Sequence, residues 1–215
     1  WLSRTTRPSM SVVITPSPME RKVPLASTIG VVAVGQTYVL LTGGIDLSVG
    51  SVVALTGLVA AAAMKYGLGP IPPLTGPLSY LALGLGLLVG LAVGAAQGWL
   101  ITYRRMPPFI VTLGTMVGLR GLTLAYYYAM PTHSLPNDFK WISDGHLWII
   151  PAPALIMLAL YVVTWYILRN TKFGRYCYAI GGNETAARLA GVSVDRYKVA
   201  VYAVSGLLAG VTGMI

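Results

Sequence analysis

Long uninterrupted runs of apolar residues dominate the chain. Between Leu25 and Met64 the only charged residue is Asp46, and between Trp148 and Leu168 there is none. Because roughly 20 helical residues cross a hydrocarbon core, such runs are typical of membrane-spanning helices rather than of the short alternating strands of a barrel. The pattern predicts an all-α, polytopic transmembrane helix bundle. Its expected spans lie at about 25–42, 49–64, 78–101, 108–130, 148–168 and 199–215.

Composition agrees with a membrane protein. Hydrophobic residues make up 55% of the chain, charged residues 10%, and the mean hydropathy is +0.71. Soluble domains carry about a quarter charged residues. Residues 1–24 are the exception, because they mix Ser, Thr and Pro with four cations. We therefore expect a poorly ordered polar leader at 1–24, followed by a transmembrane domain at 25–215.

The net charge of +9 suits nucleic acid in principle, but the positions of the cations argue against such a partner. Lys and Arg collect at the ends of the expected spans, at 104–105 and throughout the loop 169–198. Short loops rich in Lys and Arg remain on the cytoplasmic side of a membrane. Both loops are therefore predicted inside, and the segments 65–77 and 131–147 outside.

The stretch "LTGGIDLSVGS" interrupts the first apolar run. The 40 residues before the predicted outer end at Met64 would form a helix roughly 60 Å long, twice the membrane thickness. Gly43 and Gly44 disfavour helix, and Asp46 or Ser48 can cap a new one. The sequence therefore predicts a broken or tightly folded helix pair at 42–51. Two crossings would start Leu25 outside, whereas one crossing with a re-entrant half-helix would start it inside.

Glycine recurs every fourth residue in the third span. Spacing of this kind places small residues along one helical face, where helix backbones approach each other closely in lipid. The face can serve packing within the bundle or self-association of the chain. The predicted helix-packing residues are Gly86, Gly90, Gly94 and Gly98.

A single arginine, Arg120, lies near the middle of the fourth span. A charge at that depth costs several kcal/mol, about 2.5–3.5 on the most lenient scale, so it must face protein or water. Arg120 can act in a transport path, or can hold helices together through backbone carbonyls. It can also pair with Asp46 if the helix break lies at the same depth.

A short polar helix is predicted between the fifth and sixth spans. Asn183 is a favourable N-cap, Glu184 can pair with Arg188 one turn later, and Gly191 suits the position after the helix end. Seven residues are too few to form a stable helix alone in water. Either a partner protein or the membrane surface is therefore expected to hold this helix, and its small alanines offer the membrane little apolar area.

Candidate catalytic chemistry is absent from the sequence. Cys177 is alone, the two histidines at 133 and 146 have no cluster of ligands around them, and no phosphate-binding GxxxxGK[ST] motif occurs. We therefore expect no catalytic residue, no metal site and no cofactor bound by this chain, which is not predicted to be an enzyme.

Three motifs give the chain a specific resemblance. They are "LLTGGIDLSVGSVVAL" at 40–55, "MPPFIVTLGTMVGLRGLTL" at 106–124 and "TKFGRYCYAIGGNETAARLAGVSVDRYK" at 171–198. The chain resembles the membrane permease subunits of bacterial sugar ABC importers of the ribose, xylose and inositol kind. Those permeases have a further span before the first motif and extend past the equivalent of Ile215. The resemblance thus implies a chain truncated at both ends.

The resemblance also implies partners and site residues. It implies a multi-pass protein of the bacterial inner membrane that imports a monosaccharide, with an ABC ATPase subunit, a periplasmic sugar-binding protein and a second permease copy. The loop 169–198 would contain the helix that couples to the ATPase. The coupling residues would be Gly182, Asn183, Glu184, Ala186, Ala187, Arg188 and Gly191. Residues of the translocation path or gate would be Gly43, Gly44, Asp46, Ser48 and Arg120.

Two other classes of function remain open on the residues alone. An ion-coupled secondary transporter also uses broken helices with a buried acidic residue. A membrane scaffold without transport activity needs only the helices. The three possibilities differ in what transport requires. An ABC permease needs ATP and a binding protein, a secondary transporter needs an ion gradient, and a scaffold transports no substrate.

Overall fold

The computed structural model describes residues 18–67, 72–129, 145–147 and 150–215. Its helices are α1 (Pro18–Leu41), α2 (Val49–Tyr66), α3 (Ser79–Tyr103), α4 (Pro108–Ala129), α6 (Ala152–Asn170), α7 (Lys172–Gly182), α8 (Glu184–Leu189) and α9 (Val194–Thr212), with a 3₁₀ turn at Gly76–Leu78. Strands β1 (His146–Leu147) and β2 (Ile150–Pro151) form a small antiparallel hairpin. Among the described residues, four helical stretches, at 49–66, 76–103, 108–126 and 152–170, are long and apolar enough to cross a membrane. The predicted all-α transmembrane bundle is confirmed.

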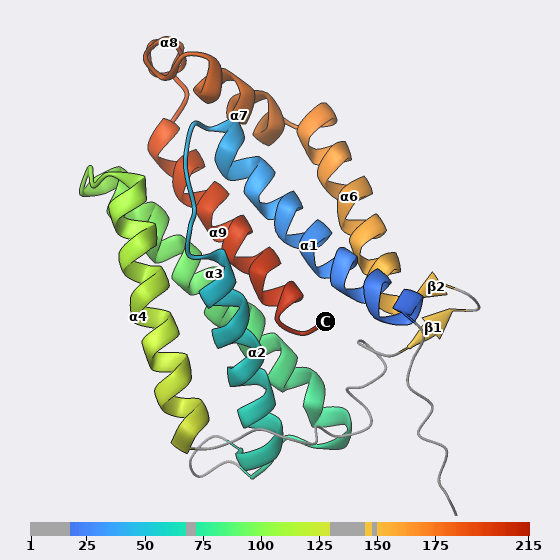
Figure 1. The fold of residues 1–215 in the computed structure, drawn as a ribbon. Helices are drawn as coiled ribbons and strands as arrows, with labels where there is room; N and C mark the ends of the chain where they lie inside the picture. The colour runs from blue at the N-terminus through green and yellow to red at the C-terminus, as the bar shows by residue number, and fades with distance from the viewer. Residues whose placement is uncertain (1–17, 68–71, 130–144, 148–149) are drawn as a thin grey trace, which may run out of the picture.

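Helix α9 lies at the centre of the bundle. It packs most extensively on α3 and also contacts α1 and α2, while α4 lies on the outside against α2 and α3 (Figure 1). Helices α7 and α8 cover one end, and the β1–β2 hairpin lies toward the other (Figure 1). The turn between α3 and α4 meets α8 at the first end, where both basic loops of the sequence come together. We call this the basic end.

The glycine face of α3 is in contact with α9. A Cβ added at Gly90 would overlap the backbone carbonyl of Gly206, and one at Gly94 would overlap the carbonyl of Tyr202. At Gly98 it would lie 2.8 Å from the Cα of Val199, and at Gly86 2.6 Å from the Cε of Met214. The four glycines thus serve packing inside the bundle, since α9 covers three of them and Met214 with α2 covers Gly86.

The predicted break between the first two spans is present and spans 42–48. Helix α1 ends at Leu41, Gly43 turns the chain with a φ of 72°, and α2 begins at Val49. Helix α1 starts on the side of the hairpin and ends beside α7, and the chain then returns through α2 (Figure 1). The start of α1 and the end of α2 therefore lie toward the same end of the bundle, opposite to the basic end, which is the arrangement that two crossings would produce (Figure 1).

Expected and observed helix ends differ in several places. Helix α6 begins at Ala152 rather than at 148, because Ile150 and Pro151 form strand β2. Helix α1 begins at Pro18, so residues 18–24 are helical, whereas they were expected to belong to the leader; residues 1–17 lie outside the described residues. Helix α9 begins at Val194 rather than at 199. The starts of α1 and α9 differ for the same reason. An apolar run indicates only the part of a helix that can lie in the hydrocarbon core, and the helix itself extends into neighbouring polar residues. Proline suits a first helical turn at Pro18, and an acidic residue suits one at Asp195.

Candidate functional site

The first candidate region is the basic end of the bundle, where α7 turns the chain away from α6. Thr171 caps α7 by accepting a hydrogen bond from the backbone N–H of Gly174, at 3.3 Å, and donates one to the carbonyl of Ile167, at 2.7 Å. Gly174 packs so closely on the backbone of Leu168 that a side chain there would overlap it. Helix α7 then buries Cys177 and Ile180. Burial raises the pKa of the Cys177 thiol to about 11, so the thiol remains protonated and unreactive at neutral pH.

Helix α8 has well-formed caps at both ends, as the sequence predicted. The side chain of Asn183 accepts a hydrogen bond of 2.9 Å from the backbone N–H of Ala186. After the helix, Gly191 adopts a φ of 82°, and its N–H donates to the carbonyl of Arg188 while that of Val192 donates to Ala187. This pair of bonds is a Schellman motif, which satisfies carbonyls at the helix end. Local caps therefore fix where so short a helix begins and ends.

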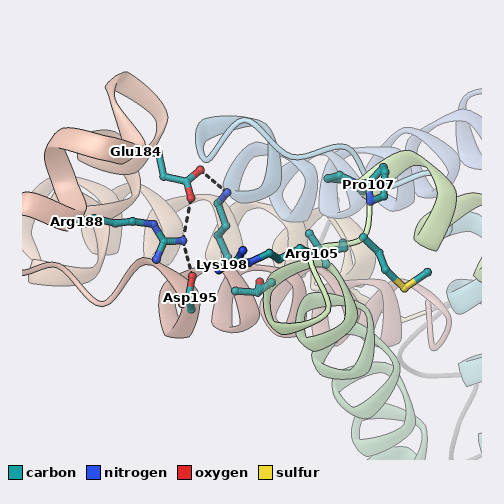
Figure 2. Close-up of a pocket in the computed structure, with 10 residues that line it drawn as sticks. Arg105, Pro107, Glu184, Arg188, Asp195 and Lys198 are labelled. Carbon is teal, nitrogen blue, oxygen red and sulfur yellow. Dashed lines mark hydrogen bonds and ion pairs between the residues drawn. The ribbon is translucent and has the colours of Figure 1, made fainter.

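Charged side chains fasten α8 to the start of α9 (Figure 2). Arg188 pairs with Glu184, at 3.0 Å, and also with Asp195 of α9. Glu184 in turn accepts a bond of 2.6 Å from the Nζ of Lys198. Hydrogen bonding to Lys198, and then to Arg188, lowers the pKa of Glu184, and Arg188 likewise lowers that of Asp195. Exposed pairs of this kind contribute only about 0–1 kcal/mol each, so the network orients α8 more than it stabilises the fold.

The sequence predicted the pair within α8 but missed the two ties to α9. Glu184 and Arg188 are one helical turn apart, which periodicity reveals. Asp195 and Lys198 follow a left-handed turn at Gly191, and only the direction of that turn brings them back over α8. Helical spacing therefore could not predict the contacts that Asp195 and Lys198 make with α8.

The predicted coupling residues divide into two groups. Gly182, Asn183, Ala186, Arg188 and Gly191 are exposed at the basic end, and Glu184 is half-buried. Ala187 is buried with Ile180 and Val194, so it holds α8 against its neighbours and is not itself available to a partner. Leu189 is the most exposed large apolar side chain described, at 85%. An exposed leucine on a capped, solvent-facing helix is what a helix docking into a protein groove would present.

A hollow of about 510 Å³ lies beside α8, between it and the turn that joins α3 to α4 (Figure 2). Its lining residues are Ile101, Thr102, Arg105, Met106, Pro107, Pro108, Glu184, Arg188, Asp195 and Lys198. We call it the basic-end hollow. Arg105 has a φ of 54°, the left-handed conformation that non-glycine residues rarely adopt.

The second candidate region is a buried polar cluster at the helix break, formed by Asp46, Ser48, Gln97 and Ser205. Asp46 accepts hydrogen bonds from the backbone N–H and the hydroxyl of Ser48, at 3.0 and 2.7 Å, and from the hydroxyl of Ser205, at 3.0 Å. Gln97 of α3 donates to the hydroxyl of Ser48 at 2.6 Å. The cluster therefore joins the broken segment to α3 and α9 at once.

One expectation about this segment is wrong. Neither Asp46 nor Ser48 caps α2: Ser48 occupies the N-cap position but makes no side-chain bond to the first turn. Its hydroxyl is already engaged with Asp46 and Gln97, which leaves it unable to serve the helix. Gly44, by contrast, is needed for close approach, because a Cβ there would lie 2.7 Å from the hydroxyl of Tyr202, which donates to the carbonyl of Ile45.

Arg120 lies on α4 at the edge of a second hollow, of about 410 Å³, between α2 and α4. The residues around it are Leu47, Gly50, Ser51, Ala54, Met116, Arg120, Thr123 and Leu124. Ser51 bridges the two helices here by donating to the carbonyl of Met116, at 2.8 Å. Within the described part of the chain the ion pairs all lie around α8, so Asp46 and Arg120 do not pair. The carboxylate of Asp46 bonds to Ser48 and Ser205, whereas Arg120 lines the hollow between α2 and α4.

Comparisons with known proteins agree on the kind of chain this is. Residues 23–215 match the family described as "Branched-chain amino acid transport system / permease component". The ribose import permease protein RbsC is 42% identical over 189 residues in Haemophilus influenzae and 43% over 188 residues in Bacillus subtilis; both alignments cover 86% of this chain and 56% of the relative. The xylose transport system permease protein XylH of Escherichia coli is 30% identical over 247 residues, covering 86% of this chain and 61% of the relative.

This chain thus spans little more than half the length of these curated relatives. No solved structure was found to match it.

Proposed function

Because the chain belongs to the family of branched-chain amino acid transport system permease components, we propose that it is the transmembrane permease part of an ATP-driven importer for a monosaccharide of the ribose or xylose type. The observation that supports this most directly is α8. It is a short, doubly capped helix that is tied by ion pairs to the start of α9, the central helix of the bundle, and it exposes Leu189 at the basic end.

Energy in this proposal comes from a separate ATPase subunit in the cytoplasm, and this chain hydrolyses nothing and binds no cofactor. A periplasmic sugar-binding protein delivers the sugar to the opposite face, and a second permease copy completes the path across the bacterial inner membrane. The positions of the cations support this orientation, since Lys and Arg gather at the end that carries α8. The names of the relatives support the sugar, as ribose and xylose permeases lie among them.

Coupling would work through the rigid connection between α8 and α9. If a groove on the ATPase binds α8, the start of α9 is linked to it as well. Arg188 of α8 pairs with Asp195, and Glu184 of α8 pairs with Lys198. Further along α9, Ser205 contacts Asp46, and Tyr202 contacts the carbonyl of Ile45. Displacement of α8 would therefore reach the helix break, where the predicted path or gate residues Gly43, Gly44, Asp46 and Ser48 lie. Arg120, the remaining one, lies on α4 beside the start of α2.

Transport into membrane vesicles tests the proposed function. Inside-out vesicles that contain the assembled transporter should release a loaded pentose, and right-side-out vesicles should accumulate it, only with ATP on the ATPase side and the binding protein on the other. Uptake driven by an ion gradient without ATP would replace this proposal with a secondary transporter. Normal assembly without any transport would instead indicate a scaffold.

The role of α8 predicts the behaviour of Glu184→Arg. The variant removes two ion pairs and places three cations together at the start of α8, next to its partial positive charge. Since these groups are exposed, loss of the two pairs should cost the fold at most about 2 kcal/mol, and membrane levels should stay normal. Docking should weaken about tenfold, equivalent to about 1.4 kcal/mol, because the helix must be ordered for binding. Co-purification of the ATPase and ATP-driven uptake measure the effect.

The isosteric variant Glu184→Gln is the matched control. It keeps the shape of the side chain and one of its two acceptor oxygens but adds no positive charge, so ATPase binding should fall between that of the wild type and that of Glu184→Arg. If Glu184→Arg co-purifies with the ATPase as the wild type does and supports full uptake, α8 is not the coupling helix.

A further inference from the structure

The turn between α3 and α4 places an arginine in an unfavourable backbone conformation at the edge of the basic-end hollow. Helix α3 ends at Tyr103, and Arg105 follows with a φ of 54°, a position that glycine usually occupies. The N–H of Met106 closes the turn on the carbonyl of Leu100, and two prolines then lead into α4. Figure 2 shows Arg105 extending from this turn toward Lys198. A strained residue is retained where the surrounding structure or a function requires it.

The charges around the hollow do not balance. It is lined by three cations, Arg105, Arg188 and Lys198, and by two carboxylates, Glu184 and Asp195. Both carboxylates are already bound by Arg188 and Lys198. Among the described residues, no carboxylate lies within ion-pair distance of Arg105, whose side chain is exposed.

A second polar group beside the hollow also lacks a partner. The hydroxyl of Thr102, one turn before Arg105, is buried and makes no hydrogen bond to the described part of the protein. Because the Thr102 hydroxyl is itself buried, the group open to a ligand in the hollow is the exposed guanidinium of Arg105, and a guanidinium suits a carboxylate, which accepts its hydrogen bonds. The rest of the wall is apolar, with Ile101, Met106 and Pro107.

We propose that the ATPase subunit docks on the α3–α4 turn as well as on α8, and inserts an acidic side chain into the basic-end hollow against Arg105. This rests on the proposed function, which supplies the ATPase. The two docking elements are continuous, because Glu184 and Arg188 of α8 line the same hollow as Arg105. A groove that receives α8 therefore has its rim over Arg105, and a carboxylate there completes the charge balance.

Two variants at position 105 and one neighbour test the proposal in the assembled transporter. Arg105→Glu should reduce co-purification of the ATPase about tenfold. Arg105→Gly removes the charge but relaxes the backbone, so it should weaken docking while membrane levels stay normal. Arg104→Glu is the matched control: it makes the same charge change one residue away, but Arg104 lies over the ring of Trp99, at 5.2 Å, and does not line the hollow. Its ATPase binding should remain near that of the wild type.

Charge reversal on the ATPase identifies the acidic partner. Among single Asp or Glu to Lys changes along the rim of its groove, one should restore binding to Arg105→Glu and weaken binding to the wild type. Wild-type behaviour of both Arg105 variants, with loss of docking in Glu184→Arg, would overturn this inference and leave the proposed function standing. Normal docking in all variants, including Glu184→Arg, would remove both. Reduced binding of Arg105→Glu to anionic-lipid vesicles with unchanged ATPase docking would assign the hollow to a lipid headgroup and also overturn the inference.

Discussion

Gly90→Leu should prevent the chain from accumulating as a folded membrane protein. Any side chain at this position meets the backbone carbonyl of Gly206, and a backbone inside a helix cannot move aside without separating the two helices. Overpacking a tight contact costs about 1–3 kcal/mol even where side chains can adjust. Here they cannot, so we expect at least about 3 kcal/mol and loss of most of the protein. Membrane levels and the thermal unfolding temperature in detergent measure the effect.

Gly84→Leu is the control within the same helix. It makes the same substitution on α3, but a Cβ at Gly84 meets nothing within 4 Å. Its membrane level and unfolding temperature should therefore remain close to those of the wild type. Equal damage by the two variants would show that leucine at these positions harms α3 for a reason other than its contact with α9.

Asp46→Ala should produce the second-largest effect. The change removes the acceptor for three hydrogen bonds and leaves the buried hydroxyl of Ser205 without a partner. Hydrogen bonds to charged groups contribute about 1.5–3 kcal/mol, and an orphaned buried donor adds its own cost. We expect a loss of about 3 kcal/mol in the stability of the helix break and little or no transport. Asp46→Asn retains one acceptor oxygen, so its stability and its transport activity should lie between those of the wild type and those of Asp46→Ala.

Arg120 provides the check on this interpretation. Because Asp46 bonds to Ser48 and Ser205 and makes no ion pair with Arg120, the free-energy effects of Asp46→Ala and Arg120→Ala should add within about 0.5 kcal/mol. The double variant should accordingly be worse than either single one, in unfolding temperature and in uptake. A double variant no worse than Asp46→Ala alone would mean that the two charges act as a pair.

Features that depend on neighbours along the chain could be predicted from the sequence. Apolar run lengths gave the bundle, two glycines and a polar residue marked the break at 42–48, and Asn183, Glu184 and Gly191 indicated the limits of α8. The four-residue spacing of glycines on α3 indicated a close helix contact but not its partner. That α9 is the partner emerges only from the fold.

The rest of both candidate sites depends on residues far apart in the sequence. Ser48 meets Gln97 across 49 positions, and Asp46 meets Ser205 across 159. Serine and glutamine are common in many settings, so their type alone carries no signal for such a cluster. The same limit explains the N-cap expectation: Ser48 has a favourable residue type for capping, but tertiary partners occupy its hydroxyl. The conformation of Arg105 was equally invisible, because arginine gives no indication of a left-handed turn.

The glycine contact between α3 and α9 also limits how the bundle can deform. Because the backbones of these helices touch at Gly90 and Gly206, we expect them to move together as one rigid body. The Asp46 cluster fixes the start of α2 to that body. Helix α4 is held more loosely: it packs mainly on α2, and a Cβ added at Gly114, Gly118 or Gly121 would meet nothing within 4 Å. We therefore expect relative motion to be concentrated at the boundary between α4 and this body, where Arg120 lies.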